Sequence, residues 1–265
     1  MGFEKIGQKE NLPDRVVRII TESILEGEWA PGDLMPTEPE LADQFGVSRS
    51  VIRDAVRMLI ARGLVIVRHG KGMYVSPSQN RAFSDAVLLA LRREKATAWD
   101  TEEFQSSVFA EIFALASLHA LPEERERIRQ RAEEYKALFR KITGGPDSPQ
   151  SERELKTSFD GFMESVFQAT HNKVFILLGQ TMLDIRSFRD VDISSEKDCA
   201  DLVKTETAAM DRMVEAALAE EPDAARRLYR SVYSPDQELI RILKNTPVGK
   251  KPEVSLEVLK NQIRP

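Results

Sequence analysis

The sequence predicts a mainly α-helical protein in two parts: three helices with one β-hairpin, followed by a larger part that is all helix. Apolar residues recur at helical spacing along most of the 265 residues. β-branched and aromatic residues gather on either side of "HGKG", in "LVIVR" and "MYVS", which predicts a hairpin. After about Arg81 strand patterns vanish, whereas amphipathic helical patterns continue to residue 244.

The N-terminal helices have recognisable ends. Pro13 suits the first turn of a helix in "PDRVVRIITESILEGEW", whose apolar residues stand at helical spacing: Val16, Ile19, Ile20, Ile24 and Leu25. "TEPELADQFG" predicts a short helix that Thr37 caps and Gly46 ends. In "VSRSVIRDAVRMLIARG", Ser48 is the predicted N-cap and Gly63 the stop.

Helix, short helix, turn, helix and hairpin, in this order, indicate a helix-turn-helix with a wing. The third helix carries a stripe predicted to be buried: Ile52, Ala55, Val56, Leu59 and Ile60. Arg49, Arg53 and Arg57 stand four residues apart and form a second stripe, with Ser50 beside them. The N-terminal end of such a helix enters a DNA major groove, where Arg can bond guanine and Ser a base or phosphate. For Arg57 a solvated charged face is the alternative.

Composition agrees with a globular protein: 31% of the residues are charged and 42% are hydrophobic. No apolar run reaches the roughly 18–20 residues of a membrane span, and "MGFEKIGQKE" lacks the apolar region of a signal peptide. We therefore expect a cytoplasmic protein without a membrane partner. The single cysteine, Cys199, excludes an intrachain disulfide and a thiolate zinc cluster.

Charge is unevenly distributed along the chain. The net charge is −5, yet residues 46–75 hold one acidic residue, Asp54, against six basic ones: Arg49, Arg53, Arg57, Arg62, Arg68 and Lys71. A basic island in an acidic chain predicts a local nucleic-acid footprint, with a solvated surface as the alternative.

The remainder predicts six or seven helices, near residues 82–93, 101–120, 123–142, 152–170, 173–189, 196–220 and 222–244. "TGGPDSPQS" separates two of these helices. Together the helices predict an all-α bundle. We divide the chain into a DNA-binding domain (1–78), an all-helical effector-binding and dimerisation domain (79–245), and a C-terminal tail that is flexible or packs on a partner (246–265).

The stretch "GEWAPGDLMPTEPELADQFGVSRSVIRDAVRMLIARGLVIVRHGKGMYV" strongly resembles the winged helix of GntR-type bacterial transcription regulators. The helical remainder resembles the FadR-type (FCD) effector domain, through "SFDGFMESVFQATHN" and "AALAEEPDAARRLYRSVY". The resemblance implies a homodimer that binds a pseudo-palindromic double-stranded DNA operator and responds to a small-molecule effector.

The implied DNA contacts are Arg49, Ser50, Val51 and Arg53 in the recognition helix and His69, Gly70 and Lys71 in the wing, to which we add Thr37, Ser48 and Arg68. Pro39 departs from the family pattern "P.ER.L", where Arg is common.

The effector domain departs further from its relatives, many of which bind a metal through one Asp and three His. Asp160 stands near the position of the metal-binding Asp. Met163 or Glu164 stands at the position of the first histidine, and Met210 and Val232 stand at the positions of the other two histidines. With only His69, His119 and His171 in the chain, we expect no such metal site and no cofactor. The Met and Val side chains at these positions favour either a cavity for an apolar ligand or a filled core. Ser107 stands at a position where relatives frequently have an Arg. The candidate pocket residues are Ser107, Glu111, Asp160, Met163, Arg186, Met210, Val232 and Tyr233.

The sequence thus predicts a ligand-responsive transcription regulator, with repression as the expected mode. A metal-dependent sensor of a small carboxylate and a winged helix that binds protein rather than DNA are the alternatives. An enzyme is not expected. "HGKG" lacks the Ser or Thr and the spacing of a Walker loop, and no nucleophile–base constellation is visible.

Overall fold

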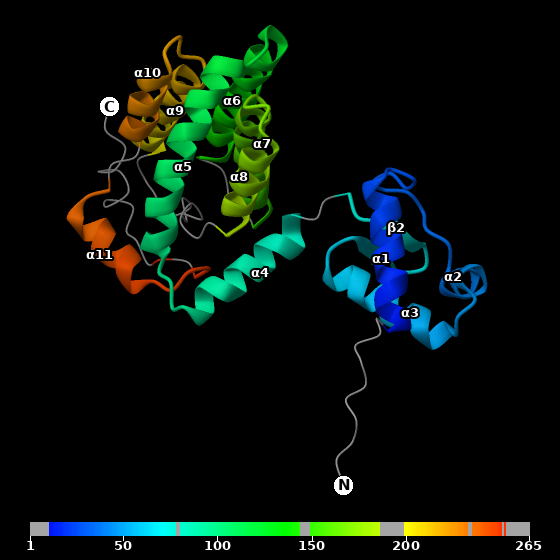
Figure 1. The fold of residues 1–265 in the computed structure, drawn as a ribbon. Coiled ribbons are helices and arrows are strands. Elements are labelled where there is room, and N and C mark those ends of the chain that lie inside the picture. The colour runs from blue at the N-terminus through cyan, green and yellow to red at the C-terminus, as the bar shows by residue number, and fades with distance from the viewer. Residues whose placement is uncertain are drawn as a thin grey trace. The chain divides into compact units, whose positions relative to one another are not determined.

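The computed structural model describes residues 11–77, 80–143, 149–185, 199–232, 235–250 and Pro252. This part of the chain is mostly helical, with one two-stranded hairpin near the N-terminus (Figure 1), so the predicted fold class is confirmed. The elements, in chain order, are α1 (Leu12–Leu25), α2 (Glu38–Phe45), α3 (Arg49–Ala61), β1 (Val65–Arg68), β2 (Gly72–Val75), α4 (Asn80–Arg93), α5 (Ala98–His119), α6 (Pro122–Ile142), α7 (Pro149–Gln168), α8 (Lys173–Ile185), α9 (Cys199–Ala217), α10 (Pro222–Val232) and α11 (Gln237–Asn245).

The chain divides into two compact units between Ala86 and Val87, within α4. Val87, Leu88 and Leu91 are partly buried against the core of the second unit, so the C-terminal half of α4 belongs with that unit. The boundary that we drew at residue 78 precedes α4. Loop composition marks where a helix begins, but only packing shows on which core each half of it lies.

The helices of the first unit begin and end where local chemistry favours it. The side chain of Asn11 accepts a hydrogen bond from the Asp14 amide (2.9 Å) at the start of α1. α2 ends at Gly46, which has a positive φ of 62°, a conformation that costs glycine little. Ser48 Oγ accepts from the Val51 amide (3.4 Å) and caps α3, as the sequence predicted.

The core of the first unit joins all three of its helices to the hairpin. Ile52, Ala55 and Leu59 are fully buried on α3, as predicted, but Ile60 is 40% exposed. Because each helical residue turns by about 100°, Ile60 lies about 80° away from Ile52, whereas Leu59 lies almost above it. The predicted stripe was therefore one residue too wide.

A third extended segment lies along the hairpin. Residues 32–35 run beside β2, where the Met35 amide donates to the Met73 carbonyl (2.8 Å) and the Val75 amide donates to the Asp33 carbonyl (2.9 Å). Leu34 and Tyr74 are bridge partners in this pairing. We predicted no strand here, because the segment is only four residues long, begins with Gly32 and is followed by Pro36.

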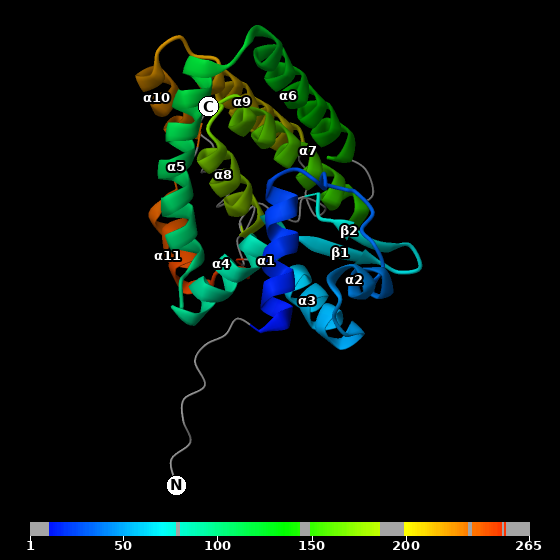
Figure 2. The same ribbon diagram turned by 45° about the vertical axis from the view of Figure 1, so that its right-hand side comes forward.

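The second unit is a helical bundle organised around α5, which packs against α7, α8, α9, α10 and α11, while α6 packs against α7 and α9. Both views show α5 as a long helix within this group (Figures 1 and 2). Aromatic rings fill the space between the helices. The Phe109 and Phe167 rings lie 5.4 Å apart and those of Phe113 and Tyr229 lie 4.6 Å apart, centroid to centroid.

The last predicted helix, 222–244, is in fact two helices, α10 and α11. Pro235 lies between them, and a proline lacks the amide that a continuous helix needs. Asp236 then caps α11, accepting a hydrogen bond from the Leu239 amide (2.8 Å). The described helices from α4 onward therefore number eight rather than six or seven. The predicted ends at residues 189 and 196 fall outside the described residues.

The first residues of the predicted tail pack on their own chain. The Val248 amide donates to the Ala96 carbonyl (3.0 Å), and the Ala98 amide donates to the Thr246 carbonyl (2.7 Å). Arg92 on α4 donates to the carbonyls of Val248 (3.4 Å) and Gly249 (3.3 Å). Val248 is buried, so residues 246–250 belong to the second unit.

Among the helices that the structure describes, none combines the length and the apolar character that crossing a membrane requires.

Candidate nucleic-acid interface and helical-domain site

The start of α3 presents polar and cationic side chains on the surface. Ser48, Arg49, Ser50 and Arg53 are all exposed, and Val51 is half-buried beneath them. Ser48 Oγ lies 2.8 Å from Ser50 Oγ, so these two hydroxyls form a pair in addition to the cap. The structure therefore brings together on one helix end the five recognition-helix residues that we predicted.

The arginines of α3 differ in whether they form an ion pair. Neither Arg49 nor Arg53 makes an ion pair with any residue that the structure describes, whereas Arg57 pairs with Asp54 (3.4 Å). The first turn of α3 contains no acidic residue. Because a helix N-terminus carries partial positive charge, two unpaired arginines there favour an anion such as phosphate.

The start of α2 has the opposite character. Glu38 and Glu40 lie in its first turn, and both the amide and the hydroxyl of Thr37 donate to Glu40 Oε2 (2.7 Å each). These hydrogen bonds, the one from the amide above all, lower the pKa of Glu40 and keep it ionised. Thr37 is exposed, as a DNA contact requires, but its hydroxyl proton is already used within the chain. Pro39 occupies the same exposed turn.

The wing turn carries the second set of predicted contacts. Arg68, His69, Gly70 and Lys71 are all exposed at the end of the hairpin. Gly70 has a φ of 70° and Gly72 a φ of 107°, backbone conformations that glycine adopts without strain. The Lys71 amide donates to the Arg68 carbonyl (2.9 Å) and closes the turn.

Sequence reasoning overlooked one residue of the wing, Tyr74. Its ring lies under the Arg68 guanidinium, whose Cζ is 4.7 Å from the ring centroid, and its hydroxyl donates to the Lys71 carbonyl (3.0 Å). The signal available in the sequence was an aromatic residue on one hairpin strand and an arginine on the other. That pattern became informative only once the register was known.

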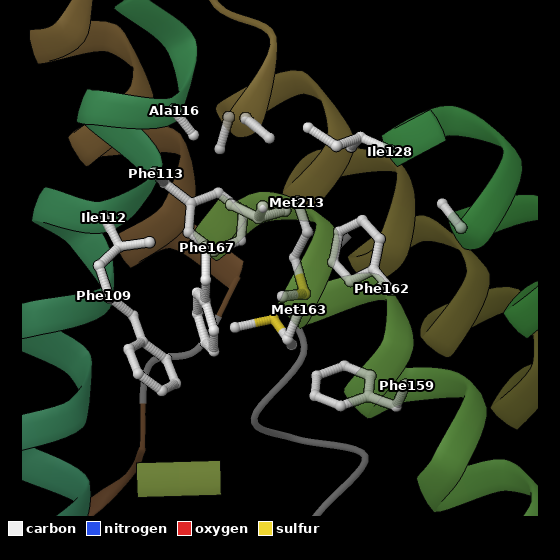
Figure 3. Close-up of a cluster of buried hydrophobic side chains, with 14 of the residues drawn as sticks. Phe109, Ile112, Phe113, Ala116, Ile128, Phe159, Phe162, Met163, Phe167 and Met213 are labelled. Carbon is white, nitrogen blue, oxygen red and sulfur yellow. The ribbon is translucent and has the colours of Figure 1, made fainter. Parts of the chain in front are cut away.

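Three of the predicted effector-pocket residues lie in the core of the second unit. Met163, Met210 and Val232 are 1%, 0% and 4% exposed and belong to one hydrophobic cluster. Figure 3 shows Met163 surrounded by the rings of Phe159, Phe162 and Phe167. Side chains therefore occupy the space around this methionine.

Three polar pocket candidates, Ser107, Glu111 and Asp160, are not members of that hydrophobic cluster. Glu111 forms a two-pronged ion pair with Arg226 on α10, in which Nε and Nη2 donate to the two carboxylate oxygens (2.8 and 2.9 Å). This hydrogen bonding lowers the pKa of Glu111 and raises that of Arg226. Asp160 accepts from Lys156 one turn earlier on α7, and Ser107 donates to the Glu103 carbonyl (3.1 Å). Arg186 and Tyr233 lie outside the described residues.

Among the residues that the structure describes, no three His, Cys, Asp or Glu side chains come together as metal ligands would. His171, one of the three histidines, pairs with Glu124 on α6 (2.9 Å) at the surface.

The chain is similar to known proteins both in sequence and in fold. Residues 12–75 match the family described as bacterial regulatory proteins, gntR family. The HTH-type transcriptional regulator YieP of Escherichia coli (strain K12) is 39% identical over 103 residues, which cover 39% of this chain and 42% of that protein. The galactonate operon transcriptional repressor of the same strain is 28% identical over 167 residues, which cover 62% of this chain and 69% of that protein.

The fold of both units recurs in a solved structure, Streptococcus agalactiae GntR, with a TM-score of 0.57 over 82% of this chain and 95% of that one. At 19% identity this likeness concerns the fold alone. The alignment with YieP spans less than half of that protein. The family assignment therefore concerns the matched helix-turn-helix region. Residues 12–75 therefore form a winged helix-turn-helix domain of the bacterial GntR family of regulatory proteins.

Proposed function

We propose that the chain is a transcription regulator that binds operator DNA through the start of α3 and the wing. The observation that carries the proposal is the pair Arg49 and Arg53, exposed and without a counter-charge among the described residues at a helix N-terminus. Their planar guanidinium groups can each bond a guanine edge through two hydrogen bonds. Arg68 and Lys71 in the wing supply charge for phosphate, which positions the domain without reading sequence.

The DNA-bound form in this proposal is a homodimer on a pseudo-palindromic operator. One recognition helix reads only a few base pairs, and a two-fold axis doubles that surface. The second unit supplies dimerisation and, as a FadR-type domain, the response to a small-molecule effector. Repression is the proposed mode, supported by the likeness to a protein described as an operon repressor.

The burial of Met163, Met210 and Val232 supports a filled core at that place rather than a ligand cavity. An effector would act by binding one dimer state more tightly than the other. We propose neither catalysis nor a resident metal.

A selection experiment tests the proposal directly. Duplexes enriched by the wild-type protein from a random-sequence library should contain two inverted half-sites. Arg49→Ala should weaken binding to such a duplex by about 1–3 kcal/mol and relax the preference at one base position of each half-site. Lys71→Ala should weaken binding to enriched and random duplexes alike and reduce the salt slope of the binding constant by about one.

Arg131→Ala is the matched control, since Arg131 is an exposed α6 residue that pairs with Glu134 (3.0 Å) and its loss changes the net charge equally. It should leave binding unchanged. A salt slope near zero for the wild type, or an Arg49→Ala variant that binds like Arg131→Ala, would exclude the proposed function.

A further inference from the structure

The outer face of the hairpin is built around one aromatic residue. In the antiparallel register Tyr74 lies opposite Ile66, and Arg68 lies opposite Gly72. Arg68 and Tyr74 are therefore diagonal neighbours on the same face, which is where long side chains on adjacent strands can meet. The guanidinium lies over the ring at 4.7 Å, within the range of a cation–π contact.

The same residue also holds the wing turn. Tyr74 Oη donates to the Lys71 carbonyl (3.0 Å), and the Lys71 amide donates to the Arg68 carbonyl (2.9 Å). These two hydrogen bonds link Arg68 to Lys71 across the turn and link Lys71 to Tyr74 on β2. On the other side of β2, Leu34 is the bridge partner of Tyr74, and its Cδ1 would lie 3.0 Å from a Cβ at Gly72.

A guanidinium that stacks on a ring keeps its N–H groups at the edge of the stack, where an anion can reach them. Arg68 makes no ion pair with the residues that the structure describes, so its charge is available. Stacking already restricts the rotamers of Arg68, and the hydrogen-bonded turn restricts the positions of the Lys71 side chain. Both side chains therefore lose less conformational entropy when they bind an anion.

We infer that Tyr74 is a positioning residue for the wing: its ring orients Arg68, and its hydroxyl orients Lys71, toward the phosphates of a bound duplex. This inference rests on the proposed function. Tyr74 itself is half-buried and needs no contact with DNA for this role.

Two double-mutant cycles test the inference, with a fluorescein-labelled duplex of random sequence as the probe and dissociation constants measured at several salt concentrations. In the first cycle Tyr74→Leu removes the ring, and it should weaken binding about two- to fivefold in the wild type. In the Arg68→Ala background the same change should have almost no further effect, because no guanidinium remains to be oriented.

In the second cycle Tyr74→Phe removes only the hydroxyl. It should weaken binding less than Tyr74→Leu does, and its effect should vanish in the Lys71→Ala background. Tyr74→Phe retains the ring and the hairpin packing, so it also answers the case in which Tyr74→Leu does not fold. Thermal unfolding followed by Trp29 fluorescence, with Trp99→Phe present in every variant, shows whether the first unit is intact.

The outcomes distinguish failure of the positioning role of Tyr74 from failure of DNA binding by the wing. Equal losses from the Tyr74 changes in both backgrounds would overturn the inference, since a residue that merely stabilises the domain acts independently of Arg68 and Lys71. If Arg68→Ala and Lys71→Ala themselves leave duplex binding and its salt slope unchanged, the wing does not bind DNA and the proposed function fails at that point.

Discussion

At position 111 a single carboxylate shows how a neighbour decides a residue's role. The sequence placed Glu111 among the candidate pocket residues. In the structure both of its oxygens are held by Arg226, and Arg226 also donates to Asp223 (2.6 Å). The Glu111 and Arg226 side chains are 45% and 31% exposed, so solvent weakens the pair. The arrangement ties α5 to α10 at the surface of the second unit.

The pair predicts a pH dependence of stability with a definite sign. Arg226 lowers the pKa of Glu111 below its ordinary value of 4.5, so folding favours the ionised form. The stabilisation is fully present above pH 4.5 and is lost as the pH falls through the lowered pKa. Glu111→Gln should therefore lower the urea midpoint of the second unit at neutral pH, by a small amount, and the difference from wild type should shrink in acid.

Glu126→Gln serves as the control, because Glu126 pairs with Arg129 (3.4 Å) within α6 and joins no two helices. It should change the midpoint less. A Glu111→Gln effect that grows as the pH falls would contradict the assigned sign.

At the scale of elements, the C-terminal segment shows how distant parts of the chain fix one helix. Residues 246–250 lie against α4 and the start of α5, and Arg92 joins α4 to two of their carbonyls. Gly249 has a φ of 72°, and a Cβ there would lie 2.7 Å from Arg92 Nη2 and 2.9 Å from Leu88 Cδ1. The positive φ favours glycine, and an added methyl group would displace the ends of the Arg92 and Leu88 side chains.

Gly249→Ala should therefore loosen this segment. The left-handed conformation costs an alanine roughly 1–2 kcal/mol, which corresponds to about five- to thirtyfold faster hydrogen exchange at the amides that the segment protects. The amides of Val248 and Ala98 are the reporters, since they bond to Ala96 and Thr246.

Gly161→Ala on α7 is the matched control, because nothing lies within 4 Å of the added methyl group. In a helix interior this change should stabilise by roughly 0.5–1 kcal/mol and leave exchange at Val248 no faster. Exchange at Val248 that is no faster in Gly249→Ala than in the wild type would contradict the prediction.

At the scale of the whole molecule, each unit has its own core and its own tryptophan. Trp29 packs on the core of the first unit, and Trp99 packs with Ala98, Leu239 and Leu243 in the second. The chain has two tryptophans, so Trp29→Phe and Trp99→Phe each leave a fluorescence probe for one unit.

We predict that the two units unfold as separate transitions. Leu59→Ala removes a fully buried side chain from the first core and should destabilise that unit by about 2–5 kcal/mol, as seen by Trp29. The transition that Trp99 reports should stay in place. Met163→Ala should do the reverse. If either change moves both transitions together, the chain folds as one cooperative body.

Much of this architecture can be predicted because its signals are local. The capping role of Ser48, the helix end at Gly46 and the hairpin around "HGKG" each depend on a few neighbouring residues, and the structure confirms them. The break at Pro235 was equally local, and we overlooked it because the apolar pattern continues across it. The third extended segment at residues 32–35 was harder to find, since its partner lies some forty residues later.

The candidate site divides in the same way. Spacing along one helix was enough to bring Arg49, Ser50 and Arg53 to one exposed end of α3, because the helical period alone determines which side chains are neighbours. Whether a charge there is neutralised depends on residues from elsewhere, and so does the pairing of Glu111 with Arg226, 115 positions apart in the chain. Tyr74 gains its place under Arg68 from the strand register, and Met163 its place among aromatic rings from the packing of helices. Local periodicity is written in the chain, but the partners of a side chain depend on which distant surfaces fit together, and only the folded structure settles that.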